Sequence, residues 1–253
     1  MFKITKHWLV LLGLQWLVAP VWAAQEVQLL TYYTSLPYAV DGVAAADSYT
    51  VRLAQWLSQE SAGRYQFVPR QVPKKRLLYM MSKPDWLGVV AWTNPLWVED
   101  AQRQRYLWSN SLMHDHDLRV SRRDDKVLFA QGRALRPARF GGISGHFYSS
   151  LEAQFKDGLL IREDAQNELS SVLKLQHKRV DVILLQASSL AHIRAEVPDF
   201  DRWAYVDPQP QAEFERFLFT SRSHPELLTF INQSLPKLVQ DPAWQEALRS
   251  GTH

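Results

Sequence analysis

WLGVVAWTNPLWVEDAQRQRYLWSN, residues 86–110, is the stretch around which the rest of the chain can be arranged. Its apolar run LGVVA lies between turn-forming residues, which predicts a buried strand of an α/β sheet. The following loop carries two indoles, Trp92 and Trp97, and two hydrogen-bonding side chains, Thr93 and Asn94. Because ligands of parallel sheets bind beyond the carboxyl ends of the strands, this loop is a candidate binding surface. The alternative is that the tryptophans belong to a hydrophobic core.

Strand and helix patterns alternate before this stretch. Strands are expected at 27–33 and 65–68, and helices are expected to begin at Asp47 and Pro73. The order strand, helix, strand, helix, strand favours a parallel α/β sheet. The loop after the first strand adds Tyr33 and Tyr38 to the candidate binding residues.

The same order of elements returns after a charged segment that begins near His114. A strand at 139–143, a helix at 167–176 and a strand at 180–185 predict a second α/β lobe, and a strand at 214–220 returns the chain. The expected boundaries are 24–115 for the first part of lobe 1, 116–215 for lobe 2 and 216–253 for the return to lobe 1.

The first 23 residues have the pattern of a secretory signal peptide. Lys3 and Lys6 precede an apolar run, and Val21 and Ala23 are small residues at the two positions that a signal peptidase reads. The apolar run is shorter than the about 20 residues that span a bilayer. We expect cleavage after Ala23 and export to the periplasm, although a retained amino-terminal anchor is the alternative.

Composition excludes several classes of function. The 253 residues contain no cysteine, which excludes disulfides, zinc-thiolate sites and thiol catalysis. Removing residues 1–23 takes away two lysines and no acid, so the formal charge falls from +3 to +1, which argues against a nucleic-acid partner. The expectation is a periplasmic monomer without a cofactor.

Three histidines have alternative interpretations. His114 and His116 would point to the same side of a strand, which suits a divalent metal ion, but a site needs three or four ligands and no further partner is evident, so a polar surface is favoured. His146 is expected in a strand-to-helix turn next to Ser144, where free backbone N–H groups favour an anionic group. A structural histidine is the alternative. No nucleophile elbow or metalloprotease motif is present.

Four passages resemble the bacterial periplasmic solute-binding proteins of family 3, which include the polar amino acid binders of ABC importers. These passages are SLPY (35–38), VPKKRLL (72–78), RYLWSNSL (105–112) and KRVDVILLQ (178–186). The resemblance implies a type II periplasmic binding protein fold, in which two α/β lobes are joined by two crossing strands. It also implies a ligand in the cleft between the lobes and a closing hinge motion.

Two positions depart from the amino acid binders. Those proteins carry an arginine in a Thr-x-x-Arg pattern after the third strand, whereas this chain reads Thr93-Asn94-Pro95-Leu96. Arg103 lies farther on and is the candidate substitute. The binders also carry an aspartate for the ligand ammonium where this chain has Gln186, a neutral amide.

The predicted function is therefore capture of a small polar solute for an inner-membrane ABC permease or a sensor kinase, without catalysis. The alternatives are a dehydratase-like enzyme acting on a small carboxylic acid in the same cleft, and an interaction protein without a ligand. The candidate ligand-binding residues are Tyr33, Tyr38, Trp92, Thr93, Asn94, Trp97, Arg103, Ser144, His146 and Gln186.

Overall fold

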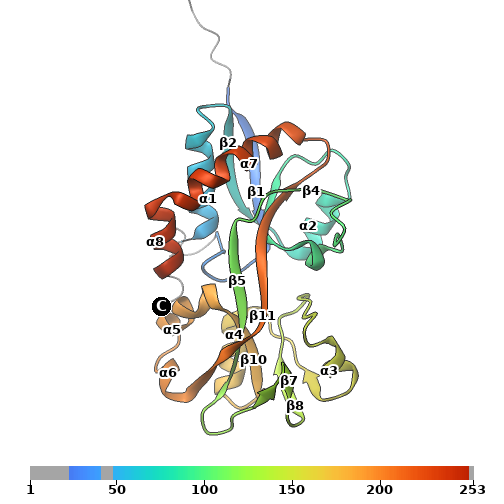
Figure 1. Cartoon of the computed structure of the whole chain (residues 1–253), viewed down its shortest axis with the longest axis vertical. Coiled ribbons are helices and arrows are strands. Elements are labelled where there is room, and N and C mark those ends of the chain that lie inside the picture. Colours follow the sequence, from blue (N-terminus) through green and yellow to red (C-terminus); the bar gives the residue numbers. More distant parts are fainter. Residues whose placement is uncertain (1–22, 41–47, 251–253) are drawn as a thin grey trace, which may run out of the picture.

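A computed structural model describes residues 23–40 and 48–250 of the chain. Within this part, a nine-stranded sheet passes through two lobes in the order β2-β1-β3-β11-β5-β10-β8-β9, with β4 paired to β11 beside this path. In Figure 1, lobe 1 is the upper half and lobe 2 is the lower half. The expected signal peptide lies outside the described residues except for Ala23. No helix in the described ranges is long and apolar enough to cross a membrane.

Lobe 1 has helices on both faces of its sheet. Its elements are β1 (Gln25–Thr31), α1 (Tyr49–Glu60), β2 (Tyr65–Gln71), α2 (Lys74–Met81), β3 (Val89–Thr93), the 3-10 helix η2 (Pro95–Val98), β4 (Leu107–Trp108), α7 (Pro225–Gln240) and α8 (Pro242–Ser250). Leu29 packs on the side of α1 and α7, and Leu30 packs on the side of α2. Because both faces are buried, the central strand β3 (VVAWT) is almost entirely apolar, as predicted for the run that ends at Ala91.

The N-cap of the first helix of lobe 1 lies one residue after the N-cap predicted at Asp47. The N-cap is Ser48, whose side-chain oxygen accepts hydrogen bonds from the backbone N–H groups of Thr50 at 3.1 Å and Val51 at 3.4 Å. Asp47 lies outside the described residues. A serine satisfies the free N–H groups of a first helical turn as well as an aspartate does, so the sequence pattern did not separate these neighbours.

Lobe 2 is smaller. Its elements are β6 (Phe129–Ala130), β7 (Arg133–Ala134), β8 (Ala138–Gly141), α3 (Glu152–Lys156), β9 (Leu160–Arg162), α4 (Glu168–Gln176), β10 (Val182–Gln186), the 3-10 helix η3 (Ala187–Ser189), α5 (Leu190–Glu196) and α6 (Phe200–Trp203). Gly141 lets α4 and β10 approach β8 closely, because a Cβ atom there would lie 2.8 Å from both Ile183 Cγ2 and Ser171 Oγ.

Two long antiparallel strands, β5 (Met113–Arg122) and β11 (Ala204–Thr220), connect the lobes. In Figure 1 they run side by side from the upper to the lower half. The upper end of β11 pairs with β3, and β5 pairs with β10 in lobe 2. The lobe boundaries expected after residues 115 and 215 fall inside these strands.

Strand β11 begins ten residues earlier than the strand predicted at 214–220. Its lower half contains Pro208 and Pro210, and the pairing with β5 shifts register between Val206 and Pro210 and again between Pro210 and Ala212. Proline removes a hydrogen-bond donor and is found in strands mainly at bulges and edges. The prolines therefore hid this half of the strand from pattern analysis.

Candidate functional site

A cavity of about 110 Å³ lies between the two lobes. The wall of this cavity includes Tyr32, Tyr33, Lys74, Asn94 and Trp97 from lobe 1. It also includes Asp117, His146, Gln186 and Phe214 from lobe 2 and the crossing strands. A second cavity of about 180 Å³ shares Tyr32, Tyr33, Lys74 and His146 with the first and is also lined by Glu168. We call the two adjoining cavities the cleft. Each is smaller than the roughly 300 Å³ of a drug-sized site, which suits a small metabolite.

Contacts between Lys74, His146 and two tyrosines close the cleft. Lys74 Nζ, in lobe 1, donates a hydrogen bond of 2.5 Å to the backbone oxygen of Gly145 in lobe 2. The imidazole of His146 meets the rings of Tyr32 and Tyr33 edge-on, with centroids 6.2 and 6.0 Å apart. The lobes therefore touch at residues that line both cavities.

An ion pair between Arg216 of β11 and Asp115 of β5 is fully buried behind the cleft. Arg216 Nε donates to Asp115 Oδ2 at 2.9 Å. Its Nη1 donates to the hydroxyl oxygen of Tyr33 at 2.9 Å and to the backbone oxygen of Trp92 at 2.7 Å. The guanidinium thus ties a crossing strand to lobe 1 and fixes Tyr33, whose ring lines the cleft.

Asp115 extends this network into lobe 2. Its Oδ2 accepts hydrogen bonds from Ser188 Oγ at 2.7 Å and from the Tyr38 hydroxyl at 3.2 Å. Ser188 Oγ and the Tyr38 hydroxyl are themselves 2.7 Å apart. Burial raises the pKa of Tyr38 well above its usual value, so this phenol keeps its proton. The network joins both lobes at the hinge without depending on a ligand.

Two further carboxyl groups, those of Asp117 and Glu168, line the cleft without a basic partner. Burial raises the pKa of both carboxyls to about 7. Asp117 also feels the neighbouring charges of Asp115 and Glu168, which raise its pKa further. In the described part of the chain, the Asp117 carboxyl forms no hydrogen bond and neither carboxyl forms an ion pair, whereas the Ser189 side chain and the Gln186 backbone partly offset the rise in the pKa of Glu168. These acids remain available to a ligand.

Basic groups in the cleft wall are few. Burial, with the nearby charge of Lys74, lowers the pKa of His146 to about 4, so its imidazole is neutral at physiological pH. Burial also lowers the pKa of Lys74.

Gln186, at the end of β10, is 8% exposed, and its side-chain Oε1 is buried without a hydrogen-bond partner.

No model of a known protein family matches the chain, and no curated protein matches it either. Solved structures do match. An ancestral arginine-binding protein bound to arginine has a TM-score of 0.70 at 14% identity, covering 91% of this chain and 100% of that chain. A probable amino-acid ABC transporter extracellular-binding protein from Bacillus subtilis has a TM-score of 0.69 at 12% identity, covering 91% and 100%.

A third match is an ancestral amino acid-binding protein described as a precursor of cyclohexadienyl dehydratase. Its TM-score is 0.66 at 13% identity, and the match covers 90% of this chain and 96% of that chain. All three share the two lobes and nearly the full length. The chain has the fold of a type II periplasmic binding protein. The fold class predicted from the sequence is confirmed.

Half of the predicted site residues line the cavity between the lobes of this binding-protein fold: Tyr33, Asn94, Trp97, His146 and Gln186. Ser144 lies on the exposed rim of the second cavity. The amide of Asn94 is already used by the protein, because its Nδ2 donates to the backbone oxygen of Glu215 at 3.0 Å and its Oδ1 accepts from the Leu96 N–H at 3.0 Å.

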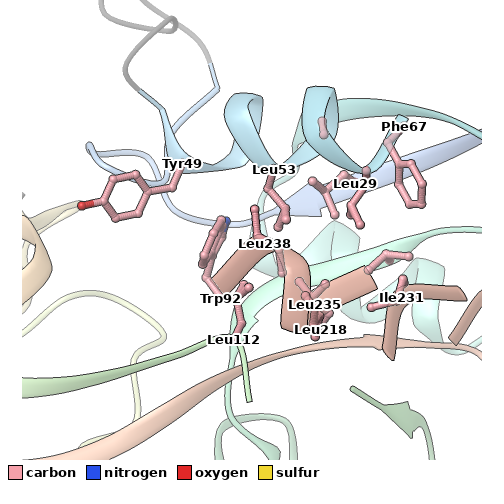
Figure 2. Close-up of a cluster of buried hydrophobic side chains, with 14 of the residues drawn as sticks. Leu29, Tyr49, Leu53, Phe67, Trp92, Leu112, Leu218, Ile231, Leu235 and Leu238 are labelled. Carbon is pink, nitrogen blue, oxygen red and sulfur yellow. The ribbon is translucent and has the colours of Figure 1, made fainter. Parts of the chain in front are cut away.

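Three predicted residues lie in the protein interior instead of on the cleft wall. Trp92 and Thr93 are 0% exposed and Tyr38 is 1% exposed. The indole N–H of Trp92 donates to Thr50 Oγ1 at 2.8 Å. Figure 2 shows Trp92 among core side chains such as Leu53 and Leu238. The expectation that Trp92 is a cleft-surface residue was therefore wrong, and the alternative of a core tryptophan describes its position.

A β-bulge explains the position of Trp92. The register between β3 and β11 passes from Val90↔Phe219 to Thr93↔Phe217, so β3 has one extra residue in between. Trp92 takes a positive φ of 65°, which is unusual for a residue with a side chain. The bulge puts both Ala91 and Trp92 into the same core cluster, although consecutive strand residues normally face opposite sides.

Arg103 lies outside the cleft. Its backbone has a φ of 53°, and its guanidinium sits 4.6 Å from the ring centroid of Phe217. It does not line either cavity, so the structure does not support it as a substitute for the missing carboxylate grip. His114 lies 3.7 Å from Glu213, but no group of three or more side chains that could hold a metal ion occurs in the ranges that the structure describes.

Sequence analysis missed the charged residues of the site: Lys74, Asp115, Asp117, Glu168 and Arg216. Asp115 and Asp117 were visible in the motif His114 to Asp117, where their two-residue spacing puts both on the same side of a strand. Glu168 follows Asn167, whose side chain caps α4 by accepting from the Ser170 N–H at 2.9 Å. Only the folding of β5, α4 and β10 against one another brings these acids together.

Proposed function

We propose that this protein is a divergent family 3 solute-binding protein that captures a small polar solute between its lobes. The observation that carries the proposal is the cleft itself: an enclosed space between two lobes, lined by aromatic rings and by polar groups without protein partners. Such a wall is suited to a small ligand that supplies the missing hydrogen bonds. The similarity to the ancestral arginine-binding protein and to the Bacillus subtilis extracellular-binding protein supports the same function.

The distribution of contacts supports opening and closing of the cleft. The hinge consists of two continuous paired strands and the buried network around Arg216, whereas the contacts in front of the cavities are one hydrogen bond of Lys74 and the ring contacts of His146. Opening would therefore break few interactions. A ligand that contacts both lobes would shift the population toward the closed form. The partner is then an inner-membrane ABC permease or a sensor kinase, reached from the periplasm.

Native mass spectrometry of freshly purified protein, expressed with its signal peptide and released by osmotic shock, tests this function. We expect a mature chain that begins near Ala24 and carries one equivalent of a small metabolite. The metabolite should be released by denaturation and rebind to refolded protein unchanged. A protein that carries nothing and shows no thermal shift with any metabolite pool would contradict the proposal.

The same experiment separates binding from catalysis. One structural match is an ancestral amino acid-binding protein described as a precursor of cyclohexadienyl dehydratase, so catalysis is the alternative to test. A binding protein saturates at one equivalent and returns its ligand with the same mass. Loss of water from the returned molecule, a mass decrease of one water, would instead indicate an enzyme.

A further inference from the structure

We propose that the solute is a small organic cation with N–H donors, held by Asp117, Glu168 and Gln186 at the lobe 2 side of the cleft. This inference rests on the proposed function and adds the chemical class of the ligand. The three residues are neighbours in the fold: Asp117 of β5 is the Cα partner of Gln186 of β10, and the backbone of Gln186 hydrogen-bonds the carboxyl of Glu168. Asp117 and Gln186 line the first cavity, and Glu168 lines the adjoining second cavity.

The charge balance of this wall favours a cation. Three carboxyl groups lie close together: the charges of Asp115 and Glu168 raise the pKa of Asp117, and the charge of Asp115 raises the pKa of Glu168. Arg216 is the one guanidinium that contacts this group within the described residues, and Asp115 occupies it at 2.9 Å. Arg216 also lowers the pKa of Asp117 and Glu168 from a distance, but neither carboxyl forms an ion pair with it. Buried carboxylates are ordinarily paired, so a cationic ligand would supply what the protein omits.

Gln186 provides an observation independent of the acids. Its side chain is more than nine-tenths buried, it lines the cavity, and its Oε1 accepts no hydrogen bond. An unpartnered buried acceptor is costly unless a ligand donor reaches it. An ammonium or guanidinium group carries several N–H donors, which can bond to this oxygen and to a carboxylate at once. A quaternary ammonium ion has no N–H and cannot do so.

Aromatic rings that border the cavity suit the same ligand. Tyr32, Tyr33, Trp97 and Phe214 border the cavity. Phe214 and Trp97 meet edge-to-face with centroids 5.0 Å apart, and both rings already accept the guanidinium of Arg216 from the buried side at 5.2 and 5.5 Å. Ring faces attract cations electrostatically and repel anions. The aromatic part of the cavity wall is therefore favourable for a positive group.

Lys74 is the charged base that lines both cavities, and it does not neutralise the acids. Its Nζ donates to the Gly145 backbone oxygen and lies 5.6 Å from the ring centroid of Tyr32, so it sits at the lobe contact. It is not among the charges that shift the pKa of Asp117. An anionic solute attracted by Lys74 would have to approach Asp117 and Glu168, which disfavours that class.

Isothermal calorimetry on the refolded, solute-free mature chain tests the inference. The probes are agmatine as a cation with N–H donors, tetramethylammonium as a cation without them, citrulline as a mostly neutral zwitterion and succinate as an anion. We expect agmatine to bind at one equivalent and tetramethylammonium to bind at least about tenfold more weakly, because it lacks the charge-assisted hydrogen bonds. Succinate should not bind.

Asp117→Asn and Glu168→Gln should each weaken agmatine binding by about tenfold or more, because each removes one charged acceptor. Glu152→Gln is the matched control: it removes the same charge from an exposed position on α3, and affinity should not change. Thermal melts check that all three variants fold. Tight binding of succinate with no binding of agmatine, or agmatine binding that is equal in Asp117→Asn, Glu168→Gln and the parent, would overturn the inference.

These outcomes are distinguishable from failure of the proposed function. If the protein carries a neutral or anionic metabolite in native mass spectrometry, it is a binding protein and the cationic assignment is wrong. If none of the probes binds and the metabolite carried from the cell is an amine or guanidine, the assignment stands with a different member of the class. If the protein neither carries nor binds any solute, the function itself fails.

Discussion

Arg216 connects the hinge to the ligand-facing surface. Its guanidinium bonds Asp115 on the neighbouring strand and the Tyr33 hydroxyl in lobe 1, while the ring of Tyr33 lines both cavities. Removing one partner of a buried ion pair typically costs about 3–5 kcal/mol, because the other charge remains without compensation. The ion pair therefore positions the ring of Tyr33 through a hydrogen bond buried behind the cleft.

At the same scale, Asp117 makes the stability of the ligand-free protein depend on pH. Its pKa rises from the usual 3.8 to about 7 on folding, mainly because of burial. The unfolded chain therefore releases this proton at lower pH than the folded protein does. Ionisation favours unfolding, so the contribution of Asp117 lowers stability progressively as the pH rises from about 4 to about 7.

Asp117→Asn should remove this dependence. At pH 8 we expect the variant to be more stable than the parent by roughly 2–4 kcal/mol, and at pH 4 the difference should vanish. Urea unfolding at several pH values measures the difference. Comparison at each pH cancels the opposite contribution of His146, whose lowered pKa reduces stability as the pH falls. A constant difference from pH 4 to pH 8 would show that Asp117 is not desolvated.

At the scale of elements, the bulge in β3 decides which tryptophan faces the ligand. Trp92 is in the core, where its ring stacks on Trp244 with a centroid distance of 6.1 Å and an interplanar angle of 16°. Trp97 is half-buried on η2 and lines the cavity. Two indoles five residues apart therefore have different roles, which a pattern of aromatic residues cannot separate.

Trp92→Ala and Trp97→Ala form a matched pair that tests this assignment. Trp92→Ala should lower the free energy of unfolding by about 3–5 kcal/mol, because it leaves a cavity in a packed core. Trp97→Ala should cost less stability and weaken ligand binding by about tenfold. Thermal unfolding and calorimetry measure the two effects. Unchanged melting of Trp92→Ala with lost affinity would place Trp92 at the ligand.

Much of the fold could be predicted from the sequence because buried strands of a two-sided sheet are continuous apolar runs. Val182 to Gln186 is such a run, and its strand was predicted within two residues at its start and one at its end. The lower half of β11 could not be predicted, because Pro208 and Pro210 are compatible with a strand only through the irregular pairing with β5.

The site could be predicted less completely than the fold. Gln186 and His146 follow strands that the sequence identifies, so their place at the cleft could be derived from the rule that ligands bind at strand ends. Glu168 and Arg216 are single charged residues whose sequence surroundings resemble those of any surface charge. Their burial becomes evident only when α4, β5, β10 and β11 are packed together.

At the scale of the whole molecule, the account predicts a hinge motion about β5 and β11. The lobes have separate cores, and the contacts across the cleft between Lys74 and Gly145 and around His146 are few. A bound solute that bonds Asp117 and Gln186 in lobe 2 and meets the rings of lobe 1 would hold them together. Loss of the solute should therefore separate the lobes.

The absence of cysteine from the chain makes this motion directly measurable. Tyr79→Cys on α2 and Ile161→Cys on β9 place spin labels on exposed positions of lobe 1 and lobe 2, where the parent side chains are 66% and 59% exposed. Gln59→Cys with Tyr79→Cys places both labels in lobe 1 as the matched control. Pulsed electron paramagnetic resonance gives the distance distribution of each pair.

Comparison of the Tyr79–Ile161 label distance before and after removal of the bound solute tests the central claim most directly. Protein purified with its solute should show a single short distance, and solute-free protein should show a longer, broader distribution that returns to the short one when the solute is restored. The Gln59–Tyr79 distance should stay constant throughout. An identical Tyr79–Ile161 distribution with and without the solute would contradict capture by closure of the two lobes.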